Sequence, residues 1–88
     1  MKEYSWEEMK DFIFTTLPYY VEVDEIHHED DARFNWCLEK FGNHLFAMKP
    51  TIGGIYSFND VNARWDAFAY YFLFKNKEDA AYFKLTWI

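Results

Sequence analysis

The densest group of potentially reactive side chains in this 88-residue chain lies between Glu22 and Asp31, in the sequence EVDEIHHEDD. It holds six carboxylates, two imidazoles and no lysine or arginine. Neutral imidazoles and carboxylates are ligands for zinc, manganese and iron. His27 and His28 are adjacent, however, so their side chains point to opposite faces of a strand or diverge by about 100° on a helix. We therefore expect no metal site, and His27 and His28 are candidate ligands only if the loop curls.

The same stretch has two further interpretations. One is a solvated acidic loop between a strand and a helix. The other is a surface that binds a basic partner protein, because complementary charge steers association. Trp36 lies away from the apolar stripe of its predicted helix, which makes it a candidate for exposure or for an interface. The predicted partner-binding residues are Glu22, Asp24, Glu25, Glu29, Asp30, Asp31 and Trp36.

No recognisable catalytic motif accompanies these residues. Asp66 stands out because it lies in an apolar stretch that we predict to be a strand. We expect it at the start of that strand, paired with Arg64 or Lys49, rather than acting as a catalytic acid. Cys37 lies beside an apolar helical stripe, where a free cysteine usually serves packing. The chain is therefore predicted to be non-enzymatic and to use no cofactor.

Composition limits the classes of partner. The net charge is −6 at pH 7; residues 1–43 carry 4 bases and 11 acids, and residues 44–88 carry 5 bases and 4 acids. Such a chain repels phosphate backbones, so binding to long nucleic acids or anionic membranes is disfavoured. A single cysteine excludes an internal disulfide, and no signal peptide or membrane-spanning run is visible. We expect a cytoplasmic protein.

Three helices are predicted around these residues. The first covers 4–17, where Ser5 and Glu8 form a capping box and Trp6, Met9, Ile13 and Leu17 form a buried stripe. The second covers 31–41 and ends at Gly42, which suits the left-handed conformation that closes a helix. The third begins after Asn76 and runs to the end of the chain; it carries an apolar row at Ala80, Phe83 and Trp87 and a second row at Ala81, Leu85 and Ile88.

Strands are predicted at 19–25, 44–49, 55–58 and 64–74. Residues 19–25 alternate as a half-buried strand does, and residues 19–49 have the form of a β-α-β unit. Residues 64–74 are apolar on both faces, which predicts one long central strand that is covered on both sides, or covered on one side and docked to a partner on the other. We therefore predict a single α+β domain over residues 1–88, with three helices on a three- or four-stranded, mainly antiparallel sheet, in the order α-β-α-β-(β)-β-α.

The aromatic strand followed by KEDAAYFKLTW resembles a pattern in short uncharacterised proteins of tailed bacteriophages. The similarity covers about 25 residues at the C-terminal end and transfers no functional residues. It implies a phage-encoded protein that works in the host cytoplasm and binds and redirects a host protein.

The function predicted from these observations is that of a small, acidic, non-enzymatic interaction protein that modulates a partner through its acidic surface. Two alternatives remain open. One is a domain that binds a small ligand or divalent metal through the His and carboxylate cluster at 22–31. The other is a homo-oligomeric structural protein, such as a homodimer, that assembles through its aromatic strand.

Overall fold

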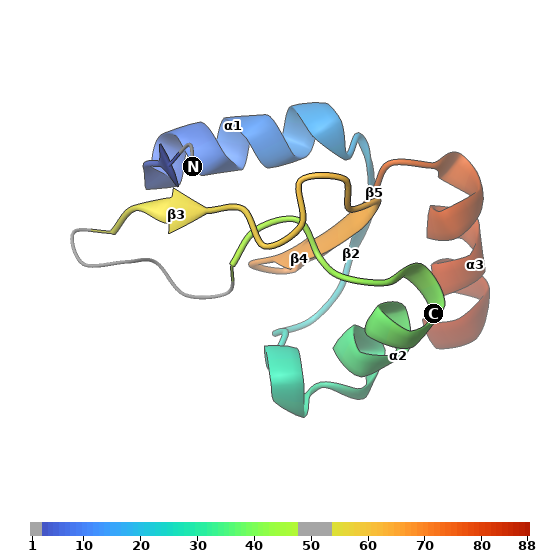
Figure 1. Ribbon diagram of the computed structural model, residues 1–88. Coiled ribbons are helices and arrows are strands. Elements are labelled where there is room, and N and C mark those ends of the chain that lie inside the picture. Colours follow the sequence, from blue (N-terminus) through green and yellow to red (C-terminus); the bar gives the residue numbers. More distant parts are fainter. Residues whose placement is uncertain (1–2, 48–53) are drawn as a thin grey trace.

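The computed structural model describes residues 3–47 and 54–88. Its helices are α1 (Trp6–Thr16), α2 (Ala32–Phe41) and α3 (Lys77–Trp87), with a short 3₁₀ helix η1 (His28–Asp30) before α2. Its strands are β1 (Glu3–Tyr4), β2 (Tyr19–Glu22), β3 (Tyr56–Ser57), β4 (Trp65–Phe68) and β5 (Tyr71–Phe74). Figure 1 shows their arrangement, with α1 on one side of the sheet and α2 and α3 on the other.

The main sheet has three antiparallel strands in the order β2-β5-β4. β1 and β3 form a separate antiparallel pair next to the start of α1. Three helices packed on an antiparallel sheet confirm the predicted α+β class. The predicted weak strand at 55–58 corresponds to β3.

The prediction of one long strand over 64–74 is wrong, because this stretch folds back on itself as the β4-β5 hairpin. Ala69 and Tyr70 form a two-residue turn, with Phe68 opposite Tyr71 and Trp65 opposite Phe74. Ala69 has a φ of 55°, a conformation that two-residue hairpins require and that glycine or asparagine usually supplies. With an alanine and a tyrosine at the turn, the sequence carries no turn signal.

The predicted β-α-β unit over 19–49 is not formed. Within the described part of the predicted strand at 44–49, Phe46 makes only an isolated bridge with Phe58, and residues 48–49 lie outside the described residues. The strand before α2 pairs instead with β5, so every pairing in the main sheet is antiparallel. Of the predicted turn at 51–54, only Gly54 is described, and it has a φ of 75°.

The helix ends follow the sequence closely. The Ser5 hydroxyl accepts from the Glu8 backbone N–H and the Glu8 carboxylate accepts from the Ser5 N–H, so the capping box is confirmed. Asp31 caps α2, and Gly42 follows it with a φ of 85°. The sequence pattern predicts a buried Trp6, but this residue is 47% exposed, because it lies at the first position of α1, at the edge of the buried face.

The sheet separates two hydrophobic cores. We call them the α1 core and the α2–α3 core, after the helices that cover each face. The α1 core consists of Tyr4, Met9, Ile13, Leu17, Leu45, Phe46, Ala63 and Leu73. The α2–α3 core consists of Val21, Ile26, Phe34, Cys37, Trp65, Ala67, Phe72, Phe74, Ala80 and Phe83. Both faces of the aromatic hairpin are therefore covered by helices of the same chain.

The two predicted rows of α3 have different environments. Ala80 and Phe83 are buried and Trp87 is half-buried, which confirms the first row. Leu85 and Ile88 of the second row are among the most exposed apolar side chains in the described residues, at 87% and 75%. No helix in the described ranges is both long and apolar enough to cross a membrane.

Candidate functional site

Arg33 organises the acidic loop that precedes α2. Its guanidinium Nη1 lies 2.6 Å from Asp24 Oδ1, and its Nη2 lies 2.7 Å from Asp31 Oδ2. The same Nη2 donates to the backbone carbonyl of Glu25 at 3.1 Å. The stretch 22–31 lacks an arginine, but Arg33 lies two residues beyond it and fixes the loop at three points.

Asp31 is buried and stabilises the fold, so it is not exposed for contact with a partner. It is 7% exposed, and its carboxylate accepts from the backbone N–H groups of Arg33 and His27 at 3.0 and 3.2 Å. The hydrogen bond from the Arg33 side chain, helped by these backbone donors, holds the pKa of Asp31 far below its usual range. Its negative charge is thus matched inside the molecule.

The other predicted acidic residues are exposed. Glu22 ends β2, Asp24 and Glu25 lie in the following loop, and Glu29 and Asp30 lie in η1. The Asp24 and Glu25 side chains are 85% and 75% exposed, although Asp24 also contacts Arg33. We call Glu22, Asp24, Glu25, Glu29 and Asp30 the acidic surface.

Trp36 does not join the acidic surface. It is half-buried between α2 and α3, where its ring centroid lies 4.9 Å from that of Tyr82 and 6.2 Å from that of Trp87. The sequence pattern missed this contact because α3 approaches α2 beside its main apolar stripe.

The two adjacent histidines lie in different surroundings. His27 is exposed, with Nε2 3.9 Å from a carboxylate oxygen of Glu25. His28 is half-buried, has a φ of 48° and lines a cavity on the α1 side of the sheet. Among the residues that the structure describes, no three His, Cys, Asp or Glu side chains gather closely enough to hold a metal ion.

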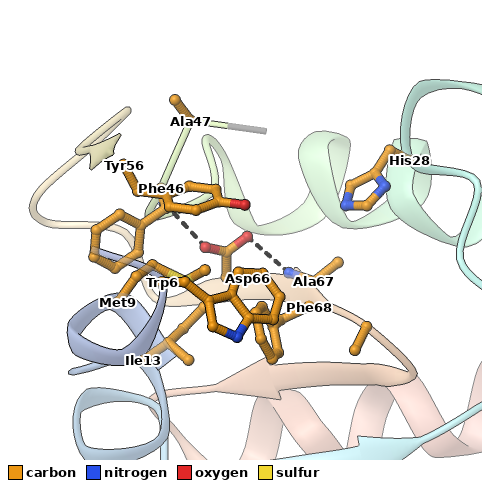
Figure 2. Close-up of a pocket in the computed structure, with 11 residues that line it drawn as sticks. Trp6, Met9, Ile13, His28, Phe46, Ala47, Tyr56, Asp66, Ala67 and Phe68 are labelled. Atoms are coloured by element: carbon orange, nitrogen blue, oxygen red, sulfur yellow. Dashed lines mark hydrogen bonds between the residues drawn. The ribbon is translucent and has the colours of Figure 1, made fainter. Parts of the chain in front are cut away.

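That cavity has a volume of about 200 Å³ and surrounds the carboxyl group of Asp66. Figure 2 shows the carboxyl between the backbones of Phe46 and Ala67, with Trp6 beside it. Its walls come from α1, η1, β3, β4, the turn residue Ala69 and residues 46–47, and include the rings of Trp6, Phe46, Tyr56 and Phe68. Residues distant in sequence therefore build this site.

Among the described residues, two backbone donors hold the Asp66 carboxyl, and no lysine or arginine contacts it. Its two oxygens accept from the N–H groups of Phe46 at 2.9 Å and of Ala67 at 2.7 Å. The predicted pairing with Arg64 is wrong, because Arg64 forms a two-bond contact with Asp79 at 2.8 and 3.0 Å. The alternative partner, Lys49, lies outside the described residues.

Burial controls the protonation of this carboxyl. Asp66 is 4% exposed, and desolvation raises its pKa to about 7, although the two backbone donors act in the opposite direction. His44 Nδ1 lies 3.9 Å from Asp66 Oδ1 but 2.6 Å from the Phe46 carbonyl oxygen, so its proton goes to the carbonyl. Burial lowers the pKa of His44, which favours the neutral imidazole.

Both non-glycine residues with positive φ in the described parts of the chain, His28 and Ala69, line this cavity. Such conformations cost free energy and concentrate at functional sites. Asp66 itself, a lone acid in an apolar stretch, is the one sequence signal that pointed here.

Comparison of the chain with protein-family models, with curated proteins and with solved structures found no match.

Proposed function

We propose that this chain is a small, non-enzymatic interaction protein that binds a basic surface of a partner protein through the acidic surface defined above. The observation that supports this proposal is the way Arg33 holds the loop. Its contacts with Asp24, Asp31 and the Glu25 carbonyl fix the backbone from which the exposed carboxylates project. A fixed loop loses little conformational entropy on binding.

The charge balance of the loop also supports the proposal. Residues 22–33 contain six carboxylates and one arginine, which leaves a charge of −5 with neutral histidines. Carboxylates this dense attract a basic surface and raise the association rate at low salt. The resemblance to short phage proteins favours a host protein in the cytoplasm as the partner, one whose nucleic-acid-binding surface the carboxylates block by mimicking phosphate charge.

The test compares two charge reversals of equal size. Glu29→Lys with Asp30→Lys changes the acidic surface, and Glu7→Lys with Asp11→Lys changes exposed residues of α1, on the other face of the sheet. Asp31 is left intact because its carboxylate caps α2. Each variant and the wild type are used to capture partners from a bacterial lysate at low and high salt.

We expect a protein that the wild type and the α1 reversal retain at low salt and that the η1 reversal loses. For that protein, the η1 reversal should lower the association rate by about tenfold or more at low salt, and high salt should remove the difference. Equal retention by both reversals would contradict a role for the acidic surface.

A further inference from the structure

We propose that the cavity around Asp66 is a binding site for an alkylammonium group, with the Asp66 carboxylate accepting its hydrogen bonds and the rings of Trp6 and Phe68 covering its cationic charge. The cavity is lined by residues outside the acidic surface. A negative result for this site would therefore not contradict the proposed function, and the reverse also holds.

Within the described residues, the Asp66 carboxyl group has unused acceptor capacity. An ionised carboxylate can accept about four hydrogen bonds, two on each oxygen. Each Asp66 oxygen accepts one backbone N–H, from Phe46 or from Ala67. With the donors of the described residues alone, one acceptor position remains on each oxygen. A primary ammonium group carries three donors that can fill these positions.

A cation is also what this buried acid lacks in the described residues. Arg64 is engaged by Asp79, and His44 directs its Nδ1 to the Phe46 carbonyl. A buried carboxylate without a counter-charge is costly, and an incoming cation offsets that cost.

The aromatic wall suits the same ligand. The Trp6 ring centroid lies 5.0 Å from that of Phe68 and 6.0 Å from that of Tyr56, and all three rings line the cavity around the Asp66 carboxyl. Aromatic faces attract cations within about 6 Å of the ring, most strongly when water is excluded.

Size and charge exclude the other ligand classes. The cavity, at about 200 Å³, is smaller than the roughly 300–1,000 Å³ of sites for drug-sized ligands, so a nucleotide does not fit. An anion would meet the Asp66 carboxylate. A metal ion would find too few ligands in the described residues. A short apolar chain that ends in an ammonium group can pack against the rings and donate hydrogen bonds to the Asp66 carboxylate.

Butylammonium is the probe, with 1-butanol as its uncharged counterpart. Binding is followed by NMR at the backbone amides of Phe46 and Ala67, which donate to Asp66. We expect saturable shifts with butylammonium and at least tenfold weaker binding of butanol. Because the cation requires the ionised acid, affinity should rise about tenfold between pH 6 and pH 8.

Two substitutions test the assigned residues. Asp66→Asn should abolish butylammonium binding. Trp6→Leu should weaken butylammonium binding about fivefold. Because Trp6 is half-exposed, this substitution leaves the buried Asp66 carboxyl unchanged. Tyr20→Leu is the matched control, because Tyr20 is an exposed aromatic residue of β2 that does not line the cavity. Equal affinity in the Trp6→Leu and Tyr20→Leu variants, or equal binding of butanol, would overturn the proposal.

Binding of a lysine-containing pentapeptide, with its norleucine analogue as the uncharged control, distinguishes a lysine side chain of a partner protein from a free ammonium ligand. Tighter binding of the lysine peptide than of butylammonium assigns the site to a protein side chain, and the reverse order assigns it to a free ligand; either order supports the site. The titration is repeated with Lys49→Met, because Lys49 is a candidate partner of Asp66 from the sequence. Absence of butylammonium binding in both backgrounds overturns the proposal.

Discussion

At the scale of single residues, Asp66 couples the fold to pH. Its carboxyl connects the segment after α2 to β4 through the Phe46 and Ala67 amides, and burial raises its pKa from about 3.8 to about 7. The folded state therefore binds this proton more tightly than the unfolded chain does. Its stabilising effect is complete below about pH 4 and is lost as the pH rises through 7.

We expect the free energy of unfolding of the wild type to fall by about 2–3 kcal/mol between pH 5 and pH 8, relative to Asp66→Asn. His44 has the opposite slope, because its lowered pKa favours folding at higher pH. Both proteins retain His44, so the difference between their curves reports Asp66. Urea unfolding at several pH values measures this difference, and parallel curves would show that Asp66 keeps its ordinary pKa when folded.

At the scale of elements, the β4-β5 hairpin contains a strained turn. Ala69 has a positive φ and Tyr70 does not, the pattern of a type II′ turn, whose first central position favours glycine. A side chain there costs free energy that glycine avoids, even though glycine loses more entropy on folding.

Ala69→Gly should therefore stabilise the protein by about 0.5–1 kcal/mol. Ala81→Gly, at an exposed position inside α3, is the control and should destabilise it by a similar amount, because glycine is a poor helix former. Thermal unfolding of the two variants beside the wild type measures both effects. Destabilisation by Ala69→Gly would contradict the strain assigned to the turn.

The same turn is a part of the fold that could not be predicted from the sequence. Helix ends depend on neighbouring residues in the sequence, so the capping box at Ser5 and the glycine at Gly42 could be predicted correctly. The hairpin was missed because apolar alternation continues through Ala69 and Tyr70, where a strand pattern and a turn look alike.

The candidate sites were predictable to different degrees. The exposed carboxylates of the acidic surface could be predicted from their clustering in the sequence alone. The role of Arg33 and the cavity around Asp66 could not, because both depend on contacts that only the folded chain creates.

At the scale of the whole molecule, the sheet keeps the two cores apart. Ile13 packs in the α1 core and Phe83 in the α2–α3 core, on opposite faces of the same three strands. Substitutions on opposite faces share no side-chain contact, so their effects on stability should be independent.

Ile13→Val and Phe83→Leu should each destabilise the protein, and their combined effect should equal the sum of the two within about 0.5 kcal/mol. Phe72→Leu with Phe83→Leu is the contrasting pair, because these rings stack at 4.6 Å between centroids. We expect that pair to depart from additivity by more than about 0.5 kcal/mol. Chemical unfolding of the single and double variants measures both cycles, and strong coupling of Ile13 with Phe83 would show that the cores are not independent.

The two-residue turn at Ala69–Tyr70 also restricts which insertions and deletions the β4-β5 hairpin can accept. Opposing residues of a hairpin share a face, so the turn sets which side of the sheet each residue of β4 occupies. If an insertion or deletion of one residue shifted the pairing by one position, Trp65 would move from the α2–α3 core to the α1 core, and Asp66 would move the opposite way. Length changes at this hairpin should therefore survive natural selection in steps of two residues, or as a bulge that leaves the register of β4 intact.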